Sequence, residues 1–507
     1  MDRRRFLHHS TLATAGAWLA GVAPVRGALR VTGARPLPER FDEVDHFALT
    51  HALRDGRQPA PVTPGETADV VVVGGGIAGL TAAYRLGGRR VLVLEKEARC
   101  GGNSRSREVD GVRYPLGAFL NQGPIPPFTD FFRETGAEFL PLAPEQHVLR
   151  LGDRRVADPL GAGRPELPWP GAERDALGRA VERLRGLLDP ATGIAFPRAT
   201  NPPQIRALDR HTLWQDYAAQ GLPPRVRELF DLLISARIAD SGEHLSAWIG
   251  NYLLSTVVDE SFTMAGGHGD YSRRLEAALT ARQPDALRTG FTVLRVENAG
   301  REEVHVTGID AAGQVQTIAA GCAVIAAPKF FAARVVPGLT AARPEVYSRL
   351  HYNAYLVAQV FLRQPLALPF ETGLAGERLA RFAVASHRLP GNAAPDRGVI
   401  TLYAPFPRRQ GRARLLASDP GALAQRLLDD LLWAYPEVGP AVEDVALHRW
   451  GHPMMTAEPG LDEVLAQARE SHGRIAFGHS DNLGVTGLYS AVWAGMDAAA
   501  EAEVILY

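Results

Sequence analysis

The chain has 507 residues, of which 46% are hydrophobic, and its formal net charge is -1. This length and apolar content allow a large buried core, organised as two interleaved domains. Positive and negative residues are mixed along the chain and no basic tract stands apart, which argues against nucleic acid as a partner. Lys96 and Lys329 are the only lysines. Nearly all the positive charge is therefore arginine, and few lysines are available for chemistry.

The first 30 residues have the pattern of an export signal. A twin-arginine start, Arg3-Arg4-Arg5-Phe6-Leu7, precedes a moderately apolar run at 11–23 and then small residues. A run this short does not span a bilayer, so the pattern predicts a Tat signal and no transmembrane segment in the mature chain. The Tat translocase is then a partner during export, and the periplasm is the expected location. A basic terminus without a targeting function is the alternative.

The clearest motif begins at residue 68, after a proline-rich and polar arm at 31–67. An apolar run at 70–73 predicts a buried parallel strand. Gly74, Gly76 and Gly79 follow at G-x-G-x-x-G spacing and open a helical pattern. The first glycine permits a tight turn, the second lets the backbone approach a pyrophosphate, and the third brings helix and strand together. Open N–H groups at the helix start then face the phosphates.

A second apolar run, 91–94, ends in Glu95, whose carboxylate is placed to accept a ribose hydroxyl. Strand, helix, second strand and terminal acid are all in order, which favours dinucleotide binding over a ligand-free glycine turn. A second glycine pair follows directly. The predicted cofactor-binding residues in this region are Gly74, Gly76, Ile77, Ala78, Gly79, Glu95 and Lys96.

The two cysteines, Cys100 and Cys322, are not expected to pair with each other. Cys322 opens an apolar run at 322–327, so we expect it in the core. The motifs C-x-x-C, C-x-x-C-H and H-E-x-x-H do not occur. Zinc, covalent haem and thiol redox chemistry therefore have no motif support, and no metal site is predicted.

The remaining patterns divide the chain into alternating parts of two domains. Helical patterns separated by proline-rich breaks predict a largely helical cap or substrate domain at 127–264, and strand-rich patterns with one helix predict its sheet at 335–455. The parts assigned to the dinucleotide-binding domain are 68–126, 265–334 and 456–507. The expected helices are 77–86, 128–135, 176–188, 212–219, 225–254, 271–281 and 421–433.

Several of these stretches resemble the flavin-containing amine oxidoreductase superfamily. Arg99-Cys100-Gly101-Gly102-Asn103-Ser104 resembles its R-x-G-G-x-x-S/T continuation, and Leu116-Gly117-Ala118-Phe119 resembles the stretch that passes the flavin ring. Short stretches around Trp450 and Asp481 are similar to bacterial spermidine-dehydrogenase-like proteins. The resemblance implies an α/β fold in which a Rossmann-like FAD-binding domain, of the two-dinucleotide-binding-domain type, is interleaved with an α+β substrate or cap domain.

The same resemblance implies how the cofactor is held. No cysteine matches the flavin-linking position of monoamine oxidases, so non-covalent FAD is expected. A final helix that starts near Tyr489 would direct its N-terminus at the flavin and stabilise negative charge there. The cofactor contacts that the resemblance adds are Gly101, Gly102, Asn103, Ser104, Gly117, Ala118, Phe119, Val293, Asp481, Tyr489 and Ser490.

The implied reaction is hydride transfer to flavin N5 from the carbon next to the nitrogen of an amine, with polyamine-like substrates favoured. Trp450 and Tyr489 are candidates to flank the amine as an aromatic pair. His452 either deprotonates the amine or bonds the flavin, or it is an ordinary structural histidine. Asp259 and Glu260 either attract a distal ammonium or form a solvated acidic pair.

One departure from the family bears on the electron acceptor. Many relatives have a lysine near flavin N5 on the strand that corresponds to 355–362, where this chain has Val357. Oxygen, a quinone and a redox protein all stay open as acceptors. Lys329 either replaces the missing lysine or lies on the surface, and the surface location is favoured because lysines are rarely buried.

Two other classes of function stay open. The same fold hosts flavin-dependent desaturases and isomerases of hydrophobic substrates, which an apolar, charge-free cavity would favour. Acidic groups and an aromatic cage beside the flavin would instead favour an amine. The third possibility is a non-catalytic flavin-binding module that keeps the fold.

Overall fold

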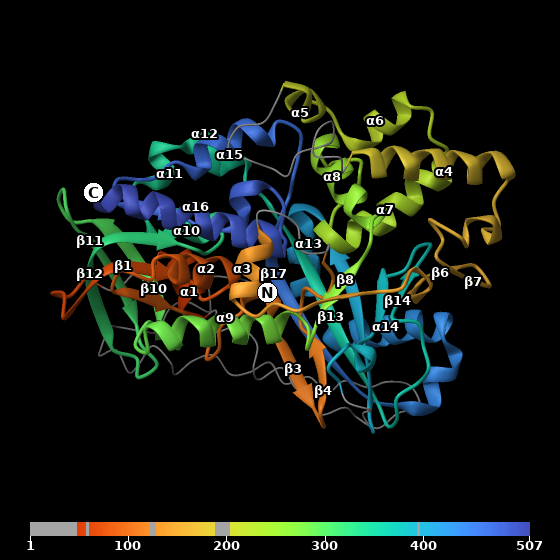
Figure 1. The fold of residues 1–507 in the computed structure, drawn as a ribbon, viewed down its shortest axis with the longest axis horizontal. Helices are drawn as coiled ribbons and strands as arrows, with labels where there is room; N and C mark the ends of the chain where they lie inside the picture. Colours follow the sequence, from red (N-terminus) through yellow and green to blue (C-terminus); the bar gives the residue numbers. More distant parts are fainter. Residues whose placement is uncertain (1–47, 57–59, 122–127, 188–202, 393–395) are drawn as a thin grey trace, which may run out of the picture.

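The computed structural model describes residues 48–56, 60–121, 128–187, 203–392 and 396–507. The predicted Tat signal and much of the arm lie outside these residues. Figure 1 shows two sheets with helices around them, one sheet on the left of the view and the other on the right. Segments from the beginning, middle and end of the chain build the left-hand sheet, as the interleaved organisation predicts.

The left-hand sheet is centred on β1 (Glu66–Val73), which pairs in parallel with β12 (Val315–Ile325) and β2 (Val91–Leu94). The four valines at 70–73 are nearly inaccessible to solvent, which explains the continuous apolar run. Val70 and Val72 face one side of the sheet, whereas Val71 and Val73 face the other. The other strands of this sheet are β9 (Leu287–Arg288), β10 (Thr292–Asn298), β11 (Val304–Ile309) and β18 (Ile475–Phe477).

Helices cover both faces of this sheet, which gives the doubly wound arrangement. One face packs against α2 (Ile77–Arg85), α3 (Phe128–Glu134), α9 (His268–Arg282) and α16 (Leu488–Leu506). The other face packs against α1 (Ala48–Arg54), α10 (Lys329–Val335) and α11 (Leu339–Ala342). A Cβ on Gly495 would lie 2.4 Å from the Ala78 carbonyl oxygen, so this glycine lets the last helix approach α2 closely.

The right-hand sheet has the strand order β17-β13-β16-β15-β14-β6-β7. Its members are β6 (His147–Leu151), β7 (Arg154–Ala157), β13 (Tyr352–Leu362), β14 (Glu371–Leu374), β15 (Phe382–Ala385), β16 (Gly398–Phe406) and β17 (Val442–Met455). One face packs on α14 (Pro420–Ala434) and on α13 (Arg408–Ala417). The other face carries the larger core, which it shares with a group of helices from the middle of the chain.

Those helices lie at the upper right of Figure 1: α4 (Gly171–Gly186), α5 (Pro203–Leu208), α6 (Leu213–Ala219), α7 (Pro224–Ile238) and α8 (Ala247–Val257). The prediction of one helix over 225–254 is wrong. Ala239 adopts a left-handed conformation with φ of 56° and ends α7. Backbone N–H groups of the turn that follows bind the carboxylates of Asp231 and Asp240, which stabilises the break.

The segment 127–264 is also less purely helical than expected, because β6 and β7 join the right-hand sheet by parallel pairing of β6 with β14. The helices predicted at 77–86, 128–135, 212–219, 271–281 and 421–433 are confirmed to within a few residues. The remaining elements are β3 (Ser106–Val109), β4 (Val112–Pro115), β5 (Phe139–Pro141), β8 (Phe262–Met264), α12 (Pro344–Arg349) and α15 (Leu461–Arg469).

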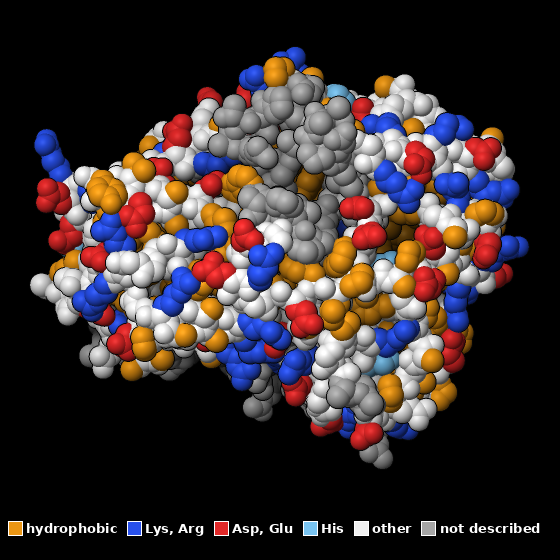
Figure 2. Space-filling view, in the orientation of Figure 1, with side chains coloured by type: hydrophobic (Ala, Val, Ile, Leu, Met, Phe, Trp, Pro, Cys, Tyr) orange, Lys and Arg blue, Asp and Glu red, His pale blue; other side chains and the backbone are white. Residues whose placement is uncertain are grey.

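Charged side chains of both signs are interspersed over the face in Figure 2, with no broad region of a single sign. No helix within the described ranges combines the length and the apolar character needed to cross a bilayer. Cys322 is fully buried in β12, as predicted, and both it and the buried Cys100 are free thiols.

Candidate active site

The first glycine turn joins β1 to α2 and depends on two of its three glycines for steric reasons. Gly74 has φ of 107°, and a Cβ there would lie 2.9 Å from the Ala326 carbonyl oxygen. A Cβ on Gly79 would lie 1.9 Å from the Gly74 carbonyl oxygen. Gly76 caps α2 without a side-chain hydrogen bond. The N–H groups of the first turn, at Ile77 and Ala78, are therefore available to an anion.

The second glycine turn lies directly against the first. Gly101 N donates to the Gly75 carbonyl at 2.9 Å, and Gly76 and Gly101 form a parallel bridge. A Cβ on Gly76 would have the Gly102 Cα as its nearest neighbour, at 3.9 Å. Two glycine backbones thus face each other with no side chain between them. This bare backbone beside an uncapped helix start fits the pyrophosphate of a dinucleotide.

Glu95 lies beneath the first turn, and its contact with a ribose hydroxyl stays a prediction. Its Oε2 accepts from Gly75 N at 2.7 Å and its Oε1 accepts from Glu97 N at 2.9 Å. Burial raises the pKa of the Glu95 carboxyl, and these two N–H bonds oppose that effect. The neighbouring Lys96 forms an ion pair with Glu97. Ser104, at the end of the second glycine turn, is buried.

The stretch from Gly117 to Phe119 passes next to the second glycine turn. A Cβ on Gly117 would lie 2.3 Å from the Asn103 carbonyl oxygen, which also accepts a hydrogen bond from Ala118 N at 3.1 Å. Asn103 Nδ2 donates to the Pro453 carbonyl at 2.9 Å. The structure therefore brings the predicted residues of the two glycine turns, the 117–119 stretch and the end of β17 into one place.

Phe119, from this stretch, forms an aromatic wall with side chains on and next to the right-hand sheet. The ring of Phe119 lies 4.8 Å from that of Tyr403 and 6.5 Å from that of Phe370. Tyr355 lies 6.2 Å from Tyr403. The sequence analysis did not single out these strand residues. The strand register alone could have found them, because pairing of β13 with β16 places Tyr355 and Tyr403 on the same face.

The two predicted aromatic partners of the amine have different surroundings. Trp450 Nε1 donates to the Leu116 carbonyl at 2.8 Å, next to the 117–119 stretch. Tyr489, in the first turn of α16, packs against Phe128 and Phe132 at 5.2 and 5.4 Å between ring centroids. No ring contact joins Trp450 to Tyr489 within the described part of the chain. The aromatic pair therefore stays a prediction.

His452 is packed against two aromatic rings. Its ring lies 4.4 Å from that of Phe330 and 6.1 Å from that of Tyr352. Burial lowers the pKa of His452 to about 4, and the positive charge of Arg412 acts in the same direction. The imidazole is therefore neutral at neutral pH, as a proton acceptor has to be.

Asp481 is almost fully buried, and its carboxylate has several partners within the protein. It accepts hydrogen bonds from Lys329 N at 2.9 Å and from the Tyr352 hydroxyl, and it lies 3.2 Å from His479 Nδ1. Burial disfavours the charged form, but these partners hold the pKa of Asp481 below its ordinary value. This carboxylate stabilises the C-terminal turn, and its contact with a cofactor stays a prediction.

Lys329 is not a surface residue, so that prediction is wrong. The side chain is 1% exposed, and Nζ donates to the Ala468 carbonyl at 2.7 Å and lies 4.4 Å from the centroid of the Phe477 ring. Burial lowers the pKa of Lys329 to about 7. The lysine is buried because α15 and β18, which come from the end of the chain, pack over the start of α10.

The other residues that the sequence singled out differ in their burial. Asp259 and Glu260 are both exposed, which confirms the solvated acidic pair. Val293 is buried near the start of β10, and Val357 is buried on β13. Ser490 is buried in the first turn of α16, whose N-cap residue makes no side-chain hydrogen bond. Among the described residues, no group of three or more His, Cys, Asp or Glu side chains could hold a metal ion.

Known proteins share the fold of this chain. Oxidoreductase PigB from Serratia sp. (strain ATCC 39006) is 24% identical over 92% of this chain and 79% of its own length. A putrescine oxidase structure superposes with a TM-score of 0.71 at 19% identity, covering 87% of this chain and 99% of that one. Cyclohexylamine oxidase from Brevibacterium oxydans IH-35A superposes with a TM-score of 0.68 at 19% identity, covering 87% and 100%.

The family model described as "Flavin containing amine oxidoreductase" matches residues 77–502. That range begins at the first residue of α2 and ends within α16, so it covers the right-hand sheet and every strand of the left-hand sheet except β1. The chain therefore belongs to the flavin-containing amine oxidoreductase family.

Proposed function

We propose that the chain binds FAD without a covalent link and oxidises an amine. The cofactor assignment rests on the backbones of Gly76 and Gly102, which face each other with no side chain between them, and on Glu95 beneath the first turn. Gly101 and Gly102 have φ of 127° and 54°, conformations that glycine adopts easily, so the second turn keeps its backbone close to the first. The paired turns offer N–H donors to both phosphates of a dinucleotide.

When bound, the flavin would accept a hydride from the carbon next to the substrate nitrogen. The protein's contribution is to orient the substrate, to exclude water and to favour the neutral amine. The wall formed by Phe119, Phe370 and Tyr403 suits this task, because an apolar environment lowers the pKa of an amine and frees its lone pair. The uncapped start of α16 can stabilise negative charge on a neighbouring group.

Polyamines are the first substrates to test, because the sequence resembles the spermidine-dehydrogenase-like branch. The experiment is anaerobic mixing of the flavin-loaded protein with spermidine, putrescine and cyclohexylamine, followed at about 450 nm, where oxidised flavins absorb. Bleaching by an amine supports the proposal. If flavin is bound and no amine bleaches it, amine oxidation is contradicted, and unsaturated hydrophobic substrates then test the desaturase and isomerase alternative.

We also propose a dehydrogenase that passes its electrons to a quinone or a redox protein, since Val357 occupies the position of the family lysine. Reduced protein should then reoxidise quickly with an added quinone and slowly in air. Fast reoxidation in air would contradict this.

Export by the Tat translocase to the periplasm is part of the same proposal, and it rests on the twin-arginine start. The test compares the periplasmic fraction of cells that express the wild-type chain with that of cells that express Arg4→Lys combined with Arg5→Lys. Loss of periplasmic protein in the double variant supports Tat export. Equal amounts of periplasmic protein for the wild type and the double variant contradict Tat export.

A further inference from the structure

A cleft of about 1070 Å³ that several charged side chains line lies in the right-hand domain, at the C-terminal end of α7. One wall is formed by α7 and the turn after it, and the facing wall by the β14–β15 turn, the end of β16, α13 and α14. None of the residues that line it belongs to the predicted cofactor-binding or catalytic residues. Its volume is that of a small-molecule site.

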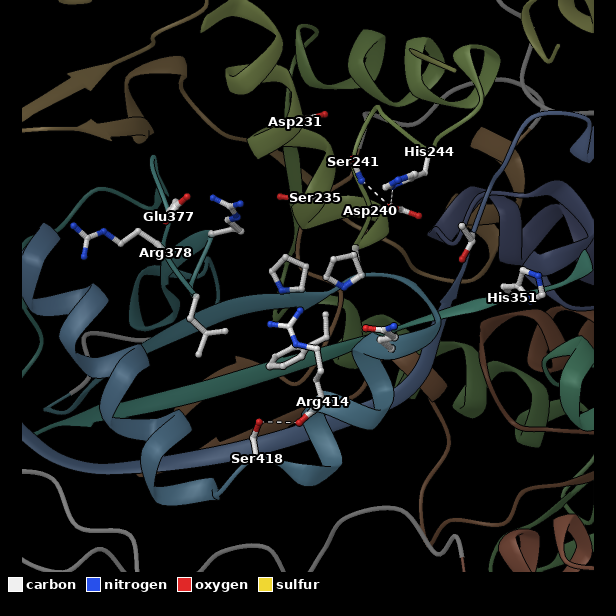
Figure 3. A pocket seen from close by; sticks show the side chains of 18 of the residues that line it. Asp231, Ser235, Asp240, Ser241, His244, His351, Glu377, Arg378, Arg414 and Ser418 are labelled. Carbon is white, nitrogen blue, oxygen red and sulfur yellow. Dashed lines mark hydrogen bonds and ion pairs between the residues drawn. The ribbon is translucent and has the colours of Figure 1, made fainter. Parts of the chain in front are cut away.

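The cleft is polarised between its two walls. Asp231 and Asp240 lie together on the α7 side in Figure 3, whereas Arg378 and Arg414 come from the facing elements. The other acidic residues that line the cleft, Glu377 and Glu458, are exposed. The arginines that line the cleft are Arg378, Arg381, Arg414 and Arg426.

Two of these charged groups are already occupied by protein partners. Asp240 accepts from Ser241 N at 2.9 Å and lies 3.3 Å from His244 Nδ1, contacts drawn in Figure 3. Arg378 lies 3.6 Å from Asp430 and 4.1 Å from the centroid of the Trp433 ring. Arg414 and Arg426 are exposed to solvent. The charged groups that remain inside the cleft are Asp231 and Arg381.

Asp231 uses one carboxylate oxygen within the protein. Oδ1 accepts from Gly242 N at 2.7 Å and from Trp214 Nε1 at 3.1 Å, whereas Oδ2 makes no hydrogen bond within the described ranges. Burial raises the pKa of Asp231 to about 6, and the positive charge of Arg381 opposes this shift. A partly desolvated carboxylate oxygen is therefore directed at the cleft without a partner of its own.

Arg381 is in the corresponding position on the facing wall. Its Nη1 donates to the Gly376 carbonyl at 2.7 Å, and its other guanidinium nitrogens bind no described residue. Burial lowers the pKa of Arg381, and Asp231 is the first of the charges that oppose this effect. Yet no ion pair of 4.0 Å or less joins the two side chains in the part of the chain that the structure describes. Each charge therefore acts on the other without a direct ion pair.

We propose that this cleft is a binding site for a small zwitterion of amino-acid or dipeptide size, whose ammonium binds Asp231 and whose carboxylate binds Arg381. A carboxylate is the geometric match for a guanidinium, because two N–H groups can donate to its two oxygens. An ammonium supplies the donor that Asp231 Oδ2 lacks. A molecule with a single charge would leave one of the two desolvated groups without a partner, which costs free energy.

The test is calorimetric titration of the flavin-loaded protein with three matched probes. Glycylglycine carries both charges, N-acetylglycylglycine lacks the ammonium, and glycylglycinamide lacks the carboxylate. We expect glycylglycine to bind and each of the other two to bind at least about tenfold more weakly, because each has lost one charge-assisted contact. Equal affinities for the three probes, or no binding of glycylglycine, would overturn the proposal.

Two variants test which residue binds each charge of the ligand. Asp231→Asn keeps an oxygen for Gly242 N and Trp214 Nε1, and it should abolish the preference for glycylglycine over the N-acetyl probe. Arg381→Gln should abolish the preference over the amide probe. Arg426→Gln, at an exposed position of the same cleft, is the matched control and should change neither. Flavin content and melting temperature report whether each variant is folded. Unchanged preferences in folded Asp231→Asn and Arg381→Gln proteins would contradict the assignment.

Discussion

The Tyr403 hydroxyl donates a hydrogen bond to the Gly117 carbonyl at 2.9 Å, and so links the middle of β16 to the stretch that follows β4. The two residues are 286 positions apart in the chain. The bond joins the aromatic wall of one domain to the predicted flavin contacts of the other. We therefore expect the relative position of substrate and cofactor to depend on this bond.

Tyr403→Phe removes this bond and keeps the ring. We expect the free energy of unfolding to fall by about 1 kcal/mol, the usual value of one buried hydrogen bond. We also expect flavin bleaching by an amine to slow about tenfold, because orientation is lost. Tyr435→Phe is the control, since the Tyr435 hydroxyl binds Thr372 at 2.6 Å and not the 117–119 stretch. Equal bleaching rates in Tyr403→Phe and Tyr435→Phe would show that the Tyr403 hydroxyl does not position the substrate.

Gly79→Ala should disrupt the first glycine turn. Its Cβ would lie 1.9 Å from the Gly74 carbonyl oxygen, which cannot move without opening the turn. We expect purified protein with little or no flavin and a free energy of unfolding lowered by roughly 1–3 kcal/mol, as for other overpacked sites. Gly88→Ala, with no atom within 4 Å of the added Cβ, should retain its flavin. A normal flavin content in Gly79→Ala would contradict the proposal that the first glycine turn binds the flavin cofactor.

Lys329 should make stability depend on pH above neutrality. Its pKa is lowered from 10.5 to about 7 in the folded chain. Between these values the unfolded chain holds a proton that the folded chain has released, so stability rises as the pH rises from about 7 towards 10. Lys329→Met lacks this titration. We expect urea unfolding to show that the free energy of unfolding of Lys329→Met, relative to that of the wild type, decreases as the pH rises from about 7 towards 10. A difference that does not change with pH would show that Lys329 stays charged in the folded chain.

His452 should contribute to stability at neutral pH and lose that contribution in acid. Its pKa falls from 6.5 to about 4 on folding, so between these values the unfolded chain takes up a proton that the folded chain refuses. Stability therefore falls as the pH drops from about 6.5 through 4. His452→Phe keeps a ring against Phe330 and should lessen this acid loss. The measurement is the melting temperature as a function of pH. Parallel curves for the wild type and the variant would show that the pKa of His452 is not lowered on folding.

Much of the cofactor site could be predicted from sequence because its signals are short-range. The order of β1, Gly74, Gly76, Gly79 and α2 follows from glycine sterics and apolar runs within about twenty residues. The interval between the first turn and Glu95 is equally local. The α/β architecture and most of the helices followed from such patterns, whereas the family was inferred from the resemblance of several motifs along the chain.

Only the tertiary structure decided the features that depend on distant segments. Lys329 is buried because α15 and β18, from the last part of the chain, pack over it, and local sequence contains no sign of that. The aromatic wall depends on the register of β13 against β16. Asp231 and Arg381 face one cleft because the break after α7 brings helix and sheet together there. Glycine spacing and apolar periodicity are encoded locally, whereas burial and charge pairing depend on which surfaces meet once the chain has folded.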